Sequence, residues 1–200
     1  MASTTEQELV VVPSPPRPTS GPVVPNAVLG TLIFVMAEIM MFGGFISAFV
    51  VAGASVDAWP PLDQPRLPAQ ETAINTLALL VSGVVTWYAG RRFAESPARA
   101  VRPLGLGIAL GLFFVVFQGV EWVDLLGDGL TMTTSTHAAF FYLIVGAHAL
   151  HAVGGLAVLL ALFVWLRRGE LTAEVFWAGR IYWSFVVLLW PLLYWQVYLT

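Results

Sequence analysis

Five long apolar segments leave this chain few folds to adopt. We expect them at about residues 26–54, 72–89, 101–126, 136–166 and 176–199. Each approaches or exceeds the roughly 20 apolar residues with which an α-helix crosses the hydrocarbon core of a bilayer. Only 10% of the residues are charged, against about 25% in soluble domains. The sequence therefore predicts an all-α, polytopic membrane protein with five transmembrane helices, which form one domain over residues 26–200.

The positions of the arginines predict the orientation of these helices. Arg66 is the only basic residue in the loops between the first and second and between the third and fourth expected helices. The loops between the second and third and between the fourth and fifth hold Arg91, Arg92, Arg99, Arg102, Arg167, Arg168 and Arg180. Because basic residues accumulate in cytoplasmic loops, we expect the N-terminus in the cytoplasm and the C-terminus outside. Residues 1–25 are polar and rich in proline, and they lack the pattern of a signal peptide. We expect them to form an extended cytoplasmic tail that contacts a neighbouring protein.

Several functional classes are excluded by what the sequence lacks. There is no cysteine, so disulfides, thiolate metal sites and a cysteine nucleophile are excluded. The net charge of −3 does not indicate nucleic acid as a partner. No G-x-S-x-G motif or Ser–His–acid set suggests a hydrolase.

Ionisable side chains inside the expected spans are the candidate functional residues, because an unpaired charge in hydrocarbon costs several kcal/mol. Glu38, His148 and His151 lie about 12 to 15 residues into their helices, which places them near the bilayer midplane. His148 and His151 are three residues apart and should share a helix face. The same stripe continues toward the outer side at His137, and Gln118 and Glu121 of the third span are expected at that level.

Two interpretations of this stripe compete. It could hold a metal or a haem, or relay protons as a small channel or transporter does. Alternatively, the histidines and acids pair between helices or contact lipid head groups. Two histidines need further ligands at the same depth to hold a metal, and only Glu38 is near enough. We therefore favour pairing and lipid contact, with no catalytic residue and no metal ligand.

Five segments, in order along the chain, resemble the cytochrome c oxidase subunit III family. FVMAEIMMFGGFISAF (34–49) resembles its glutamate-bearing helix, and WPPLDQPRLPAQETAINTLALLVSG (59–83) resembles its W-P-P loop and the helix that follows. The segment FFVVFQGVEW (113–122) resembles its L-Q-x-x-E-[YW] motif, and FFYLIVGAHALHAVGG (140–155) its paired-histidine motif. IYWSFVVLLWPLLYWQVYL (181–199) is similar to its C-terminal helix. Five spans match the short bacterial form of the family.

The resemblance implies subunit III of a haem–copper terminal oxidase in a bacterial plasma membrane. Such a subunit binds no cofactor of its own, holds phospholipid, contacts subunits I and II, and sustains proton uptake into subunit I, while haem and copper lie in the partner subunits. By position, Glu38 is the family's buried carboxylate, His148 and His151 are its paired histidines, and Glu121 is the acid of its third motif. The motifs also include the expected packing residues Trp59, Pro60, Asn75, Gly146, Gly155, Trp183 and Trp190.

Two departures from the family pattern leave the partner open. Ser184 and Val187 stand where the family's terminal helix has His and Asp, and Thr136 and His137 stand where it usually has Tyr-Gly. A quinol oxidase or a nitric oxide reductase, which divergent relatives serve as accessory subunits, is therefore an alternative partner. A haem-binding electron carrier that uses His137 or His148 is a further alternative.

Overall fold

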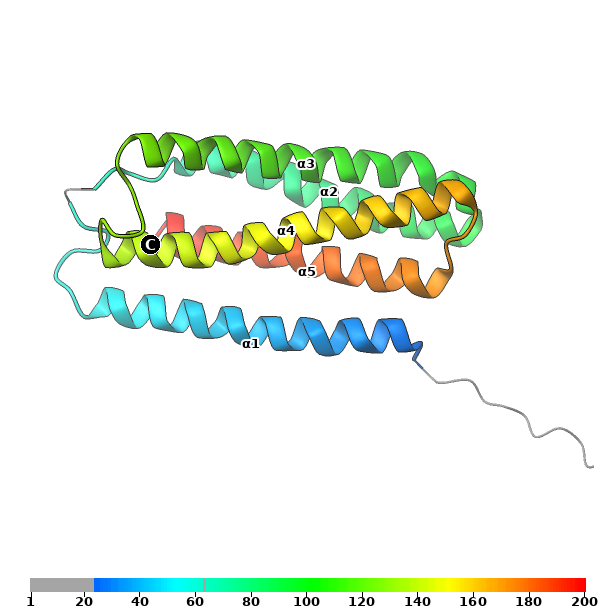
Figure 1. Cartoon of the computed structure of the whole chain (residues 1–200), viewed down its shortest axis with the longest axis horizontal. Helices are drawn as coiled ribbons and strands as arrows, with labels where there is room; N and C mark the ends of the chain where they lie inside the picture. Colours follow the sequence, from blue (N-terminus) through cyan, green and yellow to red (C-terminus); the bar gives the residue numbers. More distant parts are fainter. Residues whose placement is uncertain (1–23, 63) are drawn as a thin grey trace, which may run out of the picture.

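A computed structural model describes residues 24–62 and 64–200 (Figure 1). The expected proline-rich tail lies outside the described residues, apart from its last two positions. The helices are α1 (Asn26–Ala54), α2 (Ala69–Glu95), α3 (Pro97–Gly127), α4 (Thr136–Arg168) and α5 (Ala173–Tyr198). All five are long and apolar enough to cross a membrane. The predicted five-helix, all-α membrane fold is confirmed.

Local sequence signals, and not the apolar runs, determine where the helices end. Ser96 alone separates α2 from α3, in an extended conformation with φ −165° and ψ 129°. Pro97 follows at the first position of α3, where its lack of an N–H costs nothing. Ser135 caps α4 by accepting a hydrogen bond from the Ala138 N–H at 3.0 Å. Gly169 ends α4 with a φ of 73°, a conformation that glycine adopts without strain. As a result, α2 and α3 extend beyond the predicted 72–89 and 101–126.

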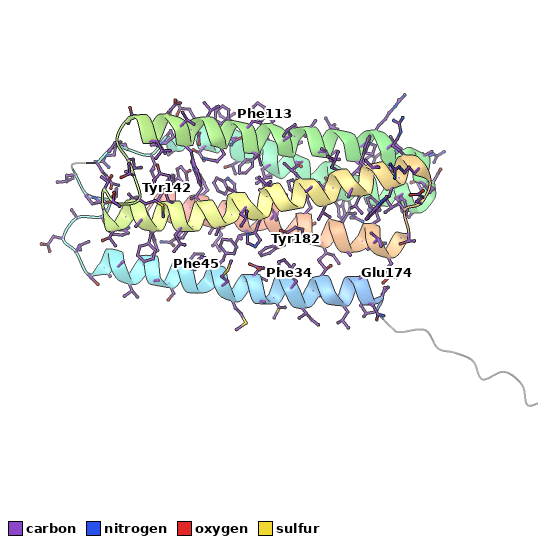
Figure 2. The ribbon with its side chains drawn as sticks, viewed as in Figure 1. Phe34, Phe45, Phe113, Tyr142, Glu174 and Tyr182 are labelled. Atoms are coloured by element: carbon purple, nitrogen blue, oxygen red, sulfur yellow. The ribbon has the colours of Figure 1, made fainter. Side chains whose placement is uncertain are left out.

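Helices α2 to α5 form a compact bundle, and α1 lies along one side of it (Figure 1). α1 packs against α5 and α4, and only Phe42 and Phe49 of its side chains are buried. Its first turn is fastened to α5, because the Glu174 carboxylate accepts a hydrogen bond from the Ala27 N–H at 2.9 Å (Figure 2). This bond satisfies one of the free N–H groups at the start of α1. Most of α1 is therefore left for lipid or another protein to cover.

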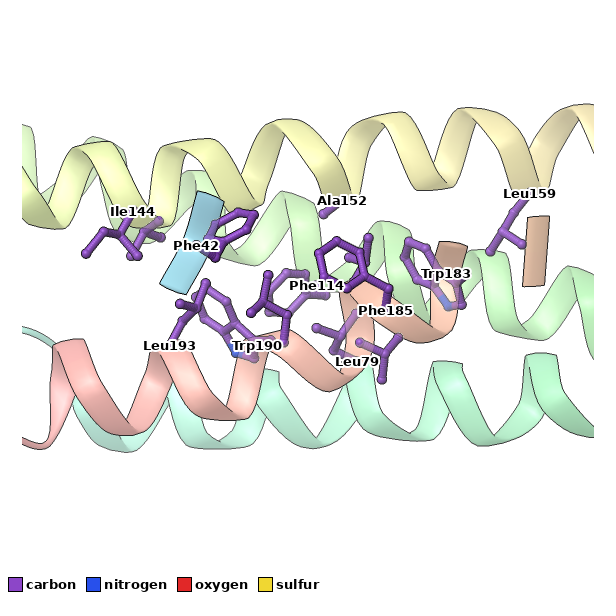
Figure 3. Close-up of a cluster of buried hydrophobic side chains, with 14 of the residues drawn as sticks. Phe42, Leu79, Phe114, Ile144, Ala152, Leu159, Trp183, Phe185, Trp190 and Leu193 are labelled. Carbon is purple, nitrogen blue, oxygen red and sulfur yellow. The ribbon is translucent and has the colours of Figure 1, made fainter. Parts of the chain in front are cut away.

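The centre of the bundle is built around two tryptophans of α5, Trp183 and Trp190 (Figure 3). A Cβ placed on Gly111 of α3 or on Gly155 of α4 would lie 2.8 Å from the Trp183 ring. Both helices therefore approach this ring as closely as glycine permits. The Trp183 indole donates to the Ser82 hydroxyl of α2 at 3.2 Å. One side chain thus joins four helices, in the manner of small-residue packing within membranes.

Three more hydrogen bonds join α2 to its neighbours. The Ser82 hydroxyl donates to the Gly107 carbonyl at 2.7 Å, and Asn75 donates to the Phe114 carbonyl at 3.1 Å. The Trp190 indole donates to the Thr76 hydroxyl at 2.8 Å. A buried polar group that lacked such a partner would cost several kcal/mol in an apolar medium.

Candidate functional site

An acid and a histidine meet near the middle of the bundle. The Glu38 carboxylate of α1 lies 2.9 Å from the His151 ring of α4, joining Oε2 to Nε2. Both side chains are largely buried, with 15% and 13% of their surface exposed. Phe42 covers the histidine edge-on at 5.4 Å between ring centroids. Apart from Phe42 and Phe49, little of α1 is buried, so this contact is its main polar attachment inside the membrane.

The orientation of the His151 ring follows from its two neighbours. Its Nδ1 lies 2.7 Å from the Ala147 carbonyl, which can only accept, so Nδ1 carries a proton. Its Nε2 therefore faces the Glu38 carboxylate, at 2.9 Å from Oε2, although Glu38 Oε2 makes no hydrogen bond of regular geometry within the described residues.

His148 is more deeply buried than His151 and faces different helices. It is 1% exposed and lies 4.8 Å from the Trp190 ring centroid, tilted by 31°. Within residues 24–62 and 64–200, neither of its ring nitrogens has a hydrogen-bond partner.

A pocket of about 150 Å³ lies beside His148, and Gln118 and Trp122 also line it. Gln118 Oε1 and Trp122 Nε1 likewise lack partners in the described part, so four buried polar atoms belong to residues around one pocket. The pocket is large enough to hold water, although most of its lining surface is apolar.

Glu121 forms a second polar cluster with neutral donors. Gln118 donates to its carboxylate at 2.7 Å and the Thr72 hydroxyl lies at 3.0 Å. Gln118 also contacts the Tyr198 hydroxyl at 3.2 Å. No salt bridge to Glu121 is present among the residues that the structure describes. The cluster joins α2, α3 and α5 near the end of the bundle that carries the C-terminus.

His137 belongs to a third cluster, which fastens the α1–α2 loop to the start of α4. Gln64 donates its amide N–H to His137 Nδ1 at 2.9 Å and accepts a hydrogen bond from Ser135 at 2.7 Å. The Trp59 ring packs edge-on against His137 at 4.9 Å. The Trp59–Pro60 peptide bond is cis. These contacts hold the α1–α2 loop against the start of α4, and the sequence alone did not predict them.

The expected histidine stripe is divided among three environments. His151 faces α1, His148 faces α3 and α5, and His137 faces the α1–α2 loop. Residues three apart on a helix point about 60° away from each other, which is enough in a close-packed bundle to reach different neighbours. No group of three or more His, Asp or Glu side chains is placed to hold a metal ion within the described residues.

Sequence reasoning missed several participants. Thr72, Gln64 and Tyr198 are uncharged, and nothing in the sequence marks them as partners of the buried ionisable residues. Arg180 was counted with the loop between α4 and α5, but it lies inside α5 and is 6% exposed. Its position inside the expected span 176–199, eleven residues before Pro191 and among apolar residues, was the available signal.

Of the packing residues that the motifs indicated, six contact other helices or loops, and Pro60 lines a pocket together with His137. Gly146 approaches the Trp122 ring, with a Cβ position 3.3 Å away, and Gly155 approaches Trp183. Trp59, Asn75 and Trp190 make the contacts given above. Their role in function stays a prediction.

Comparison with known proteins gives a consistent result. The family described as cytochrome c oxidase subunit III matches residues 20–200. Probable cytochrome c oxidase subunit 3 of Nocardia farcinica is 30% identical over 181 residues, covering 87% of this chain and 88% of the relative. The corresponding protein of Mycobacterium leprae shows the same values. Cytochrome c oxidase subunit 3 of Thermostichus vulcanus is 30% identical over 178 residues, covering 86% of each chain.

Proposed function

The chain belongs to the cytochrome c oxidase subunit III family, and we propose that it serves a bacterial haem–copper terminal oxidase without a redox centre of its own. It binds subunit I, contacts subunit II, holds phospholipid, and sustains proton uptake into subunit I. It lies in the plasma membrane, with one end of the helix bundle in the cytoplasm. This end, hereafter the Arg-rich end, carries Arg91, Arg92, Arg99, Arg102, Arg167 and Arg168.

The observation that carries the proposal is the Glu38–His151 contact. It places an acid and a histidine side by side at membrane depth, between the peripheral helix α1 and the bundle. A pair in this place suits a subunit that stabilises a proton-conducting partner better than one that conducts protons itself. Glu121 and His137 bind residues of α2, α3 and the α1–α2 loop, as structural groups do.

The first test is the composition of the complex. The tagged chain is purified in mild detergent, and the preparation is measured by a reduced-minus-oxidised visible spectrum and by copper and iron analysis. Haem a together with copper is the expected result. Haem b with non-haem iron and no copper would assign the chain to a nitric oxide reductase, and a colourless preparation with no large partner would contradict both assignments.

Two residues of α5 favour the nitric oxide reductase or quinol oxidase as the second candidate. Val187 takes the place of an acid in the family motif and packs on α2, where a Cβ on Gly83 would overlap it at 2.7 Å. Ser184 takes the place of a histidine and lines a groove between α1 and α5. At position 187, the acidic side chain of the family motif is therefore replaced by an apolar side chain that packs against α2.

The role of Glu38 is tested by sustained turnover of the purified complex. We expect Glu38→Ala to assemble, to start at a rate near that of the wild type, and to lose activity after fewer turnovers. Glu38→Gln is the informative companion, because it keeps the shape and hydrogen-bonding capacity of the side chain but cannot exchange a proton. Full lifetime in Glu38→Gln would show that packing alone matters, and full lifetime in Glu38→Ala would refute the role. Exposed Glu170→Ala is the control for loss of an acid.

A further inference from the structure

Three side chains with unpartnered polar atoms line one pocket of about 150 Å³, hereafter the α3–α4 pocket. Gln118 and Trp122 lie one helical turn apart on α3, and His148 belongs to α4. Gln118 is 4% exposed and His148 is 1% exposed. Within residues 24–62 and 64–200, Gln118 Oε1, Trp122 Nε1 and both ring nitrogens of His148 have no hydrogen-bond partner. Such groups are costly in an apolar medium, so we expect a ligand to satisfy them.

The chemistry of these four atoms selects a neutral ligand that both donates and accepts hydrogen bonds. The Trp122 indole N–H can only donate. Gln118 uses its amide nitrogen for Glu121 at 2.7 Å and for the Tyr198 hydroxyl at 3.2 Å, so its free atom is the acceptor oxygen. A neutral imidazole adds one donor and one acceptor. Two donors and two acceptors match the hydrogen-bonding capacity of water. An ion of either sign would meet two groups of the wrong polarity, and a hydrocarbon would leave all four atoms unsatisfied.

The α3–α4 pocket has room for several water molecules and lies near bulk water. At ~30 Å³ per molecule, its volume corresponds to roughly five waters. Trp122 lies five residues before Gly127, the end of α3, about 8 Å along the helix axis. His148 lies twelve residues after Thr136, the start of α4, about 18 Å along its helix. The pocket therefore extends toward the midplane from the end of the bundle opposite the Arg-rich end.

Water in this pocket would supply a polar link between two helices that have none of their own. In the described part of the chain, the side-chain hydrogen bonds of α3 go to α2, to α5 or within α3 itself. The side chains of α4 bind α1, the neighbouring loops or α4 itself. Phe114 and Trp190, both buried in the core (Figure 3), also line the pocket and make only ring contacts with His148.

We propose that the α3–α4 pocket binds a cluster of ordered water molecules, which are held by His148, Gln118 and Trp122 and join α3 to α4 inside the membrane. Internal water typically makes about three hydrogen bonds to buried polar groups that otherwise lack partners, and such bridges are nearly as favourable as direct hydrogen bonds. An apolar cavity of the same size stays dry, so the four polar atoms carry the inference. It goes beyond the oxidase assignment and does not depend on it.

The first test detects water at the Trp122 indole by nuclear magnetic resonance. The full-length chain carries 15N-labelled tryptophan and is purified in a protonated detergent, and Trp122→Phe identifies the signal of this indole. Rotating-frame cross-relaxation separates a bound water from chemical exchange by its sign. We expect a cross-relaxation peak between the indole proton and water, and none between the indole proton and the methylene groups of the detergent.

Two glycines of α3 provide a matched pair that fills or spares the pocket. Gly119 lines the pocket and Gly127 does not, and a Cβ at either position meets nothing within 4 Å. Gly119→Leu should displace the water and abolish the cross-relaxation peak. Gly127→Leu should keep the peak at its original strength.

The stability of a His148 variant gives an independent readout with opposite signs for a wet and a dry pocket. His148→Phe keeps a ring against Trp190 but removes both nitrogens. If water binds them, two hydrogen bonds are lost, and the thermal midpoint of the purified chain should fall by roughly 4–8 °C. In a Gly119→Leu background the same change should shift the midpoint by about 2 °C or less, because the water is already displaced.

Four results would overturn the proposal. They are the absence of a water peak at Trp122 in the wild type, a peak to detergent methylene groups in its place, a water peak that persists in Gly119→Leu, and a His148→Phe chain at least as stable as the wild type. The wild-type spectrum decides the question even if His148→Phe does not fold. None of these results bears on the oxidase assignment, which the haem and copper content of the purified complex decides separately.

Discussion

Alanine at Gly155 should destabilise the bundle by about 1–3 kcal/mol relative to alanine at Gly154, the cost of overpacking a filled core. A Cβ at Gly155 would lie 2.8 Å and 3.1 Å from two carbons of the Trp183 ring. A Cβ at Gly154 would meet only the Tyr182 hydroxyl, at the ordinary distance of 3.6 Å. Both changes gain the same helix propensity, about 1 kcal/mol, so their difference isolates the contact with Trp183.

Trp183 has no room to move away from the new methyl group. Its ring is fully buried and also touches Gly111, where a Cβ would lie 2.8 Å from the ring. Its indole N–H is held by Ser82 at 3.2 Å. The strain must therefore appear either as a shift of α4 away from α5 or as loss of the Ser82 hydrogen bond.

Thermal unfolding of the purified chain in one detergent measures this difference. For a chain of 150–250 residues each kcal/mol moves the midpoint by ~2–4 °C, so Gly155→Ala should unfold roughly 2–12 °C below Gly154→Ala. Tryptophan fluorescence in the folded state should change in Gly155→Ala only. Equal midpoints, or a more stable Gly155→Ala, would show that the bundle does not close on Trp183 as described.

Two further predictions concern polar groups inside the bundle. Ser82→Ala removes the acceptor of the Trp183 indole and the donor to the Gly107 carbonyl, and should lower the unfolding free energy by about 1–3 kcal/mol; stability equal to that of the wild type would contradict the hydrogen bonds. His151→Leu leaves Glu38 without its partner and should lower the unfolding free energy by about 1–3 kcal/mol, the cost of an unsatisfied buried group. The double variant with Glu38→Leu should recover most of that loss in thermal unfolding, because both polar groups are gone. A double variant as unstable as His151→Leu would show that the two side chains are not coupled.

Particular residues show why the fold was predictable and the site was not. The five helices follow from apolar runs, since backbone groups in lipid must be hydrogen-bonded within the segment and a helix achieves that locally. The contact of Glu38 with His151 was within reach of the same argument, because a charge in hydrocarbon needs a partner at its own depth. Depth alone did not separate His148 from His151, although they face different helices.

The sequence by itself determined the fold class, the number of helices, the family and the polar residues that must find partners in the membrane. These depend on local hydrogen bonding, on hydropathy and on motifs that survive along the chain. Only the tertiary structure decided which helix each of these residues meets, that Gln64 reaches His137, and that Arg180 is buried beside Gly90. The reason is physical: such contacts depend on the rotation and close approach of whole helices, which result from packing summed over many side chains.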